Sequence, residues 1–190
     1  MEIILRESER LNALVTDFLL FAQPPKSNKA PWDIRPLLEE TLDLFRHSPE
    51  YREEIQIHRS LASKEVRVHV DPDQIKQVFW NLLLNAAQAM GGEGDLRVTV
   101  EPGKDGTLGD SSPSWIRIAF SDSGKGIPPE EREKIFEPFY TTRDQGSGLG
   151  LAIVHKIVEN HAGMIKVESE LGKGSTFTLF LPAQIEEIRE

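Results

Sequence analysis

Two glycine-rich segments carry the most specific chemistry in this sequence. Residues 122–127 read Asp-Ser-Gly-Lys-Gly-Ile, and residues 146–151 read Gly-Ser-Gly-Leu-Gly-Leu. Glycine lets backbone N–H groups approach a polyanion closely and tolerates positive φ where a chain wraps around a ligand. The second segment also opens an apolar-periodic helix, so its free N–H groups and the positive end of the helix dipole favour phosphate. These features predict a nucleotide site.

Asp122 ends a segment, residues 115–120, that is predicted to be a strand. A carboxylate at the end of a buried strand can accept a hydrogen bond from an exocyclic amine such as that of adenine. The first glycine-rich segment is therefore expected at the base, and the second at the phosphates.

A helix predicted between residues 71 and 90 supplies further polar groups. Asp71 is expected to cap it, Gln74 to complete a capping box, and the two glycines at 91–92 to end it. Amide side chains recur at helical spacing along one face: Gln77, Asn81, Asn85 and Gln88. Two interpretations stay open, namely a solvated face or amide oxygens that reach a hydrated Mg²⁺ held by substrate phosphates.

The composition excludes several function classes. The 190 residues carry a net charge of -9, which argues against a nucleic-acid surface and against a polybasic membrane anchor. Cysteine is absent, so thiol nucleophiles and thiolate metal sites are excluded. No apolar run approaches the length of a membrane span. A cytoplasmic location is expected, and a membrane-anchored parent protein is compatible with it.

The first predicted element is a helix over residues 1–22 with an apolar seam. A coiled-coil seam that needs a partner and an amphipathic helix packed on its own domain fit its spacing equally well. Two prolines at 24–25 end this helix, and residues 26–31 read as a polar linker. A helix capped by Asp33 follows and runs to about residue 47. Strands are predicted near residues 55–61, 66–70, 96–101, 115–120, 163–169 and 175–181.

Four short motifs then occur in order: Asn81-Leu-Leu-Leu-Asn85-Ala, Asp122-Ser-Gly-Lys-Gly-Ile, Phe136-Glu-Pro-Phe and Gly146-Ser-Gly-Leu-Gly-Leu. In order and spacing they resemble the N, G1, F and G2 boxes of sensor histidine kinases, with most similarity to the nitrogen-regulation type. One such motif alone is weak evidence for the family, because a glycine pattern is often only a turn. Four motifs in the same order and at the same spacing are specific to the family. The resemblance covers nearly the whole chain.

The resemblance implies the α+β fold of the Bergerat ATP-binding domains, shared with DNA gyrase, heat-shock chaperone ATPases and mismatch-repair ATPases. This fold is a two-layer α/β sandwich with a mixed sheet of at least five strands and helices on one face, here preceded by one long helix. The implied cofactors are ATP and Mg²⁺. The implied divisions are half of a dimerisation hairpin (1–23), a linker (24–32), the catalytic domain (33–183) and a tail (184–190).

The matched positions imply a role for each site residue. Asp122 would bind the adenine amine, Asn85 would be a ligand of Mg²⁺, and Asn81 would lie beside the phosphates. Arg143 is the candidate cation for the γ-phosphate, since a guanidinium can make two bonds to it; a plain exposed loop arginine is the alternative. Asn81, Arg143 and Gln77 are expected to act in catalysis. The other residues expected at the nucleotide are Gly124, Gly126, Ile127, Phe136, Tyr140, Thr141, Thr142, Gly146, Ser147, Gly148, Leu149, Gly150, Leu151 and Thr176.

The implied reaction is transfer of the γ-phosphoryl group of ATP to a histidine on a partner helix, for relay to the receiver domain of a response regulator. Related hydrolases carry a glutamate at the position of Asn81, and an amide cannot act as a base, so slow hydrolysis is expected. None of the five histidines lies where the acceptor histidine should be: His47, His58, His69, His155 and His161.

The chain is therefore expected to bind ATP without phosphorylating itself, while the full-length parent forms a homodimer. Two alternative functions stay open. One is an ATPase with an ATP-driven conformational cycle, and the other is a pure nucleotide-binding module.

Overall fold

The computed structural model describes residues 11–12, 15–16, 18–19, 21–22, 26–103, 115–143 and 146–183. The residues described before position 23 are helical. The remainder of that predicted helix, most of the loop at 102–114 and the tail at 184–190 lie outside the described residues. Among the described residues, no helix is both long and apolar enough to cross a membrane.

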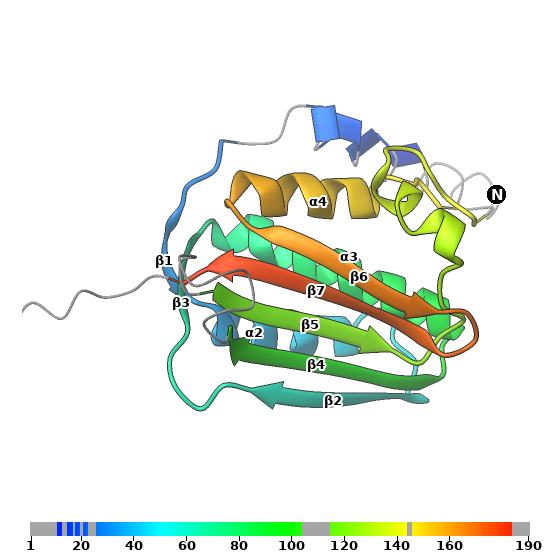
Figure 1. Ribbon diagram of the computed structural model, residues 1–190, viewed down its shortest axis with the longest axis horizontal. Coiled ribbons are helices and arrows are strands. Elements are labelled where there is room, and N and C mark those ends of the chain that lie inside the picture. Colours follow the sequence, from blue (N-terminus) through cyan, green and yellow to red (C-terminus); the bar gives the residue numbers. More distant parts are fainter. Residues whose placement is uncertain are drawn as a thin grey trace, which may run out of the picture.

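Figure 1 shows the helices and strands of the part of the chain that the structure describes. In chain order they are β1 (Ala30–Asp33), α2 (Ile34–Arg46), β2 (Ile55–Leu61), β3 (Arg67–Val70), α3 (Pro72–Met90), β4 (Gly94–Pro102), β5 (Trp115–Asp122), the 3-10 turns η1 (Pro129–Glu131) and η2 (Lys134–Phe136), α4 (Gly150–Asn160), β6 (Met164–Glu170) and β7 (Gly174–Pro182).

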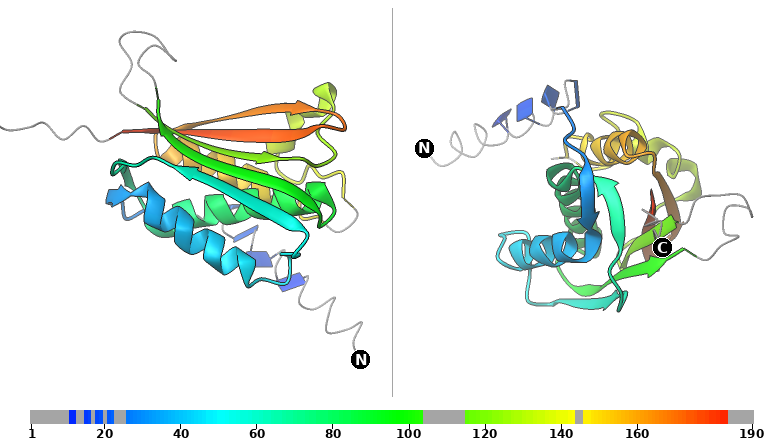
Figure 2. Two further views of the ribbon diagram at one scale, coloured as in Figure 1. Left: turned by 90° about the horizontal axis from the view of Figure 1, so that it is seen from below. Right: turned by 90° about the vertical axis from the view of Figure 1, so that its left-hand side faces the viewer.

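The main sheet has five strands in the order β2-β4-β5-β7-β6. Strands β2 and β4 are parallel, and the other neighbours are antiparallel, so the sheet is mixed. Helices α2, α3 and α4 lie on one side of this sheet (Figure 2). Fully buried side chains from both layers fill the space between them, including Leu38, Phe45, Phe79, Phe120, Val154 and Leu179. The predicted two-layer α/β sandwich is confirmed.

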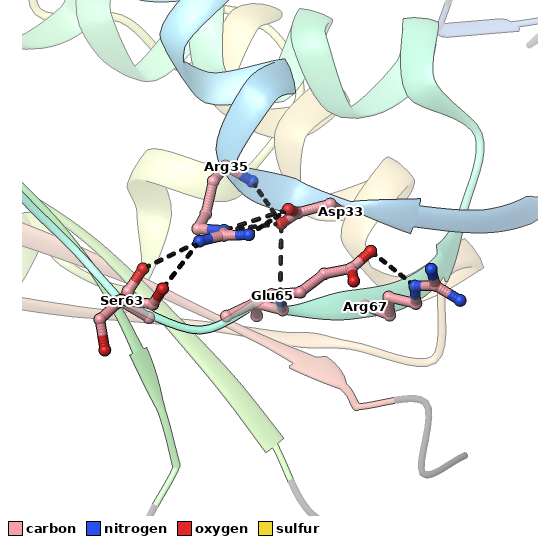
Figure 3. A network of polar contacts seen from close by, with 7 residues as sticks. Asp33, Arg35, Ser63, Glu65 and Arg67 are labelled. Atoms are coloured by element: carbon pink, nitrogen blue, oxygen red, sulfur yellow. Dashed lines mark hydrogen bonds and ion pairs between the residues drawn. The ribbon is translucent and has the colours of Figure 1, made fainter.

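Strands β1 and β3 form a separate antiparallel pair, with Ala30 opposite Val70. Residues 30–32, predicted from the sequence to lie in a linker, are thus part of a paired strand. Asp33 ends β1 and caps α2, since its Oδ1 accepts the N–H of Arg35 at 3.2 Å. The Arg35 guanidinium binds the same carboxylate and the carbonyl oxygens of Ala62 and Ser63, which ties the start of α2 to the connection before β3 (Figure 3).

Helix α3 begins and ends where the sequence predicted. The carboxylate of Asp71 accepts the N–H groups of Asp73 and Gln74, and Gly91 ends the helix in the left-handed conformation with φ of 70°. The N–H of Asp71, which a capping box would pair with Gln74, instead donates to Nε2 of His161 at 3.0 Å. This contact joins the start of α3 to the end of α4, so the two helices pack antiparallel.

Candidate functional site

Both glycine-rich segments border a single cavity of about 470 Å³. Helix α3 forms one wall, residues 125–128 and strand β7 contribute to another, and residues 140–143, 146–148 and 150–151 form the third. This volume is typical of small-molecule sites. Most predicted site residues line it: Asn81, Asn85, Asp122, Gly126, Ile127, Tyr140, Thr141, Thr142, Arg143, Gly146, Ser147, Gly148, Gly150 and Leu151.

Asp122 is the buried carboxylate of this cavity, with 8% of its surface exposed. The N–H of Gly124 donates to its Oδ1 at 2.8 Å. Burial raises the pKa of Asp122, although hydrogen bonds from the backbone of Gly124 and Ser175 and the positive charge of Arg143 act in the opposite direction. A buried carboxylate facing a cavity is a strong acceptor for an amine, because hydrogen bonds to a charged acceptor are stronger than neutral ones.

Gly124 brings the first glycine-rich segment against α3. A Cβ atom at this position would lie 2.5 Å from the carbonyl carbon of Ala89, so only glycine fits without a shift. The next residue, Lys125, donates its N–H to the oxygen of Ala89 at 3.1 Å. The turn that follows Asp122 is thereby fixed to the helix that carries Asn81 and Asn85.

Arg143 reaches across the cavity to the polar face of α3. Its Nη1 donates to Oδ1 of Asn85 at 3.1 Å and also to Oε1 of Gln88, and its Nη2 donates to the carbonyl oxygen of Asn85 at 3.5 Å. Burial lowers the pKa of Arg143 and the charge of Asp122 raises it, but a guanidinium stays protonated in proteins. The site therefore combines a buried carboxylate with a cation, as a ligand with a hydrogen-bond-donating amine and an anionic tail requires.

The polar face of α3 is only partly at the cavity. Asn81, Asn85 and Gln88 line it, whereas Gln77 does not. Gln77 lies eight residues before Asn85, or about 12 Å along the helix axis. The predicted catalytic role of Gln77 therefore has no support in its position. Gln88 was noted in the stripe but not predicted as a site residue, and its bond with Arg143 brings it into the site.

Thr176, which the resemblance places near the base, does not line the cavity. Its hydroxyl donates to Oγ of Ser121 at 2.9 Å. The neighbours Ser175 and Phe177 line the cavity instead, because successive side chains of a strand point to opposite faces of the sheet. Ser175 lies opposite Asp122 in the register of β5 and β7 and is buried. The strand alternation could have identified Ser175, had the sequence shown which face Asp122 occupies.

Three further predicted residues do not line the cavity. Leu149 is buried in the core with 1% exposure. The ring of Phe136 packs against the ring of His155, with 5.5 Å between the centroids. Gly124 acts through the backbone contacts described above. These residues pack behind the residues that line the cavity and hold them in place.

The oxygen atoms at the cavity suit a magnesium ion that arrives with a nucleotide. Among the described residues, no group of three or more His, Asp or Glu side chains is arranged to hold a metal ion by itself. Mg²⁺ in nucleotide sites keeps several waters and takes few protein ligands besides the phosphates. Asn85 lines the cavity, and its Oδ1 atom accepts a hydrogen bond from Arg143, so this oxygen is available to such an ion when Arg143 releases it.

A two-layer sandwich with a nucleotide-sized cavity between a polar helix face and two glycine-rich turns defines an ATP-binding domain. Residues 70–185 match the histidine kinase-, DNA gyrase B- and HSP90-like ATPases. The chain belongs to this family, and within it the chain is a catalytic ATPase domain of the sensor histidine kinase type.

Two curated relatives illustrate this similarity. The sensor histidine kinase ZraS of Escherichia coli (strain K12) is 39% identical over 184 residues, which cover 97% of this chain and 37% of ZraS. Sporulation kinase E of Bacillus subtilis (strain 168) is 32% identical over 182 residues, which cover 96% of this chain and 23% of the kinase. The chain thus spans less than two fifths of the length of these relatives.

Solved structures show the same fold. The catalytic domain of histidine kinase ThkA superposes with a TM-score of 0.68 at 33% identity, covering 82% of this chain and 95% of that one. Full-length ShkA in complex with AMPPNP superposes with a TM-score of 0.78 at 32% identity, covering 95% of this chain and 38% of ShkA. ThkA in complex with the response regulator protein TrrA gives 0.76 at 30% identity, covering 97% of this chain and 51% of ThkA.

Proposed function

We propose that this chain binds Mg-ATP in the described cavity and delivers the γ-phosphoryl group to a histidine on a separate helical hairpin. The observation that carries the proposal is the pairing, in one cavity, of the buried Asp122 carboxylate with the Arg143 guanidinium held by Asn85. Adenine carries an exocyclic amine, and the triphosphate carries the negative charge. ATP matches both groups.

Each part of the nucleotide has a set of side chains suited to it. Asp122 accepts from the adenine amine, and Ser175 lies beside it. The backbone N–H groups at the start of α4 face the phosphates, where the helix dipole favours negative charge. Asn85 holds Mg²⁺, which when bound neutralises part of the phosphate charge. Arg143 then exchanges its bond with Asn85 for bonds to the γ-phosphate.

The chain favours transfer over hydrolysis because of Asn81. This residue lines the cavity one turn before Asn85, where a base would activate water in a hydrolase. An amide has no basic group to accept that proton. The nucleophile is therefore the imidazole of the partner hairpin, which needs no base from this domain.

The partners follow from this chemistry. ThkA has been solved with a response regulator protein and ShkA with AMPPNP, and we extend both properties to this chain. The acceptor helix, the receiver domain and a homodimeric, cytoplasmic parent are parts of the proposal. So is the division into half a hairpin (1–23), linker (24–32), catalytic domain (33–183) and tail (184–190).

A titration with Mg-ATP tests the proposal, with bound nucleotide and released phosphate read together. We expect saturable binding with almost no phosphate release, and phosphoryl transfer to a supplied hairpin that bears the acceptor histidine. Acid-labile phosphohistidine on this chain alone would contradict the expected lack of self-phosphorylation. Steady phosphate release that Asn85→Ala abolishes would favour the ATPase alternative. Tight binding without transfer to any supplied hairpin would favour a pure binding module.

A further inference from the structure

A buried polar junction lies at the ends of α3 and α4 that face away from the cavity. His161, with 4% exposure, stands at the end of α4. Its Nε2 accepts the N–H of Asp71 at 3.0 Å, and its Nδ1 lies 2.7 Å from the carbonyl oxygen of Ile157. A carbonyl can only accept, so Nδ1 carries the proton. Nε2 is then free of a proton, and the imidazole is neutral.

Asp71 connects this histidine to two other parts of the chain. Its Oδ1 caps α3 through the N–H groups of residues 73 and 74. Its Oδ2 accepts the N–H of Asn28 at 2.7 Å, and the adjacent Lys29 donates from Nζ to the carbonyl oxygen of Asn160 at the end of α4. The segment before β1 and both helices therefore meet at His161.

The same two helices meet again at the nucleotide cavity. Helix α4 begins at Gly150, and a Cβ atom there would lie 3.4 Å from Oδ1 of Asn81 in α3. Asn81 is ten residues from Asp71, or about 15 Å along α3. A shift of α3 along α4 would thus change the distance between the amide side chains and the phosphate-binding N–H groups. Apolar side chains packed between two helices allow such sliding, whereas a hydrogen bond between the helices is directional and opposes it.

We propose that His161 is a positioning residue for the nucleotide site, because its bond to the Asp71 N–H fixes α3 lengthwise against α4. This inference rests on the proposed function, since Mg-ATP affinity is the property that it sets. The sequence alone does not identify this contact, because its two residues lie 90 positions apart.

The junction also gives the site a defined pH response. Burial lowers the pKa of His161, the bond to the Ile157 carbonyl raises it, and the charges facing it are those of Lys29, Asp71 and His69. Protonation would place an N–H on Nε2 opposite the N–H of Asp71, so two donors would face each other. The bond that positions α3 against α4 is therefore present while His161 is neutral. It is lost as the pH falls through the folded pKa of His161, which lies below the ordinary value of 6.5.

Two variants test the proposal. His161→Leu removes the acceptor, whereas His161→Gln retains an oxygen that can accept the Asp71 N–H and does not titrate. At about pH 8, where an ordinary histidine is neutral, we expect the leucine variant to raise the Kd for Mg-ATP about tenfold, equal to about 1.4 kcal/mol. The glutamine variant should stay within about twofold of the unaltered protein. Circular dichroism during heating establishes that each variant is folded.

The pH comparison separates His161 from the other titrating groups. ATP and Asp122 are the same in the unaltered protein and in the glutamine variant, so the difference between them isolates His161. As the pH is lowered from about 8 through the folded pKa of His161, followed by NMR of its imidazole resonances, we expect affinity to fall further in the unaltered protein than in the glutamine variant. Equal pH profiles would overturn the proposal, even if the leucine variant fails to fold. So would a folded leucine variant with unchanged affinity.

Failure of the proposed function gives a different result. If the unaltered protein binds no Mg-ATP over this pH range, the proposed function is wrong and this inference is overturned with it. If the unaltered protein binds Mg-ATP and Asp122→Asn weakens that binding, the proposed function stands, and the His161 variants alone decide the inference.

Discussion

Asp122→Asn should change nucleotide affinity and stability in opposite directions. The substitution retains one oxygen, which can still accept the N–H of Gly124 as Oδ1 of Asp122 does at 2.8 Å. The second carboxylate oxygen becomes an NH₂ group. A donor then meets the exocyclic amine of adenine, and the acceptor for that amine is lost.

The size of the binding loss follows from the charge of the acceptor. A hydrogen bond to a charged group contributes about 1.5–3 kcal/mol. Its loss raises the Kd by roughly tenfold to a hundredfold, since each 1.4 kcal/mol is about a factor of ten. The unpaired NH₂ group in a buried site adds to this loss. We therefore expect the upper part of this range.

The unliganded protein should become more stable. Burial raises the pKa of Asp122, so the fold disfavours its charged form relative to the unfolded chain. Above the folded pKa the buried charge lowers the free energy of unfolding, and the neutral asparagine removes this effect. The gain shrinks as the pH falls through the folded pKa and disappears below the unfolded value of 3.8, where the carboxyl is neutral in both states.

Asp33→Asn is the matched control, because folding shifts the pKa of Asp33 in the opposite direction to that of Asp122. Burial raises the pKa of Asp33, but hydrogen bonds from the Arg35 side chain and from the backbone of Arg35 and Val66 outweigh it, and the net pKa is lowered. Asparagine at position 33 should therefore lower the free energy of unfolding at neutral pH. Asp33 lies on β1, outside the cavity lining, so nucleotide affinity should not change.

Isothermal titration with Mg-ATP and urea unfolding without nucleotide measure the two effects. The reasoning is refuted if Asp122→Asn retains the affinity of the unaltered protein, because the carboxylate would then not contact the base. The argument from pKa to stability is refuted if both substitutions shift the free energy of unfolding in the same direction.

Three other substitutions test separate parts of the site. Gly126→Ala should lower the free energy of unfolding by at least about 2 kcal/mol, because φ is 71° and the new Cβ would lie 2.1 Å from the carbonyl oxygen of Glu170. Gly172→Ala is its control, with φ of 79° in open space, and should lose only about 1 kcal/mol. Urea unfolding measures both losses, and equal losses would contradict the packing argument. Arg143→Ala should weaken binding of ATP about tenfold but leave ADP nearly unchanged, and an equal effect on both in calorimetry would exclude a γ-phosphate contact. Asn85→Ala should abolish the gain in ATP affinity that Mg²⁺ provides over a chelator, and a retained gain would remove Asn85 as the metal ligand.

Most predictions based on local chemistry agree with the structure; the capping box is the exception, since the N–H of Asp71 donates to His161. Asp71 caps α3 and Gly91 ends it, because the cap and the left-handed end involve only groups within a few residues. Helical spacing alone placed Asn81 and Asn85 on one face, and both line the cavity. The sandwich fold followed from four motifs in register, and their roles at a nucleotide stay predictions.

Two of the predicted site residues that do not line the cavity miss it for a reason that a local pattern does not show. Thr176 was expected at the base, but the alternation of β7 turns Ser175 toward the cavity. A strand has a period of two, so an error of one residue reverses every side chain. Gln77 continues the helical stripe past the end of the cavity, and a helical period does not show where a cavity ends.

The sequence by itself determined the secondary structure around the site and the residue types that a nucleotide needs. The tertiary structure alone decided which of these residues meet. Arg143 contacts Asn85 from 58 residues away, and His161 contacts Asp71 from 90 residues away. Periodicity and capping report interactions between residues less than about one helical turn or one strand pair apart. Long-range contacts arise from the packing of whole layers, in which the orientation of each element depends on all the others.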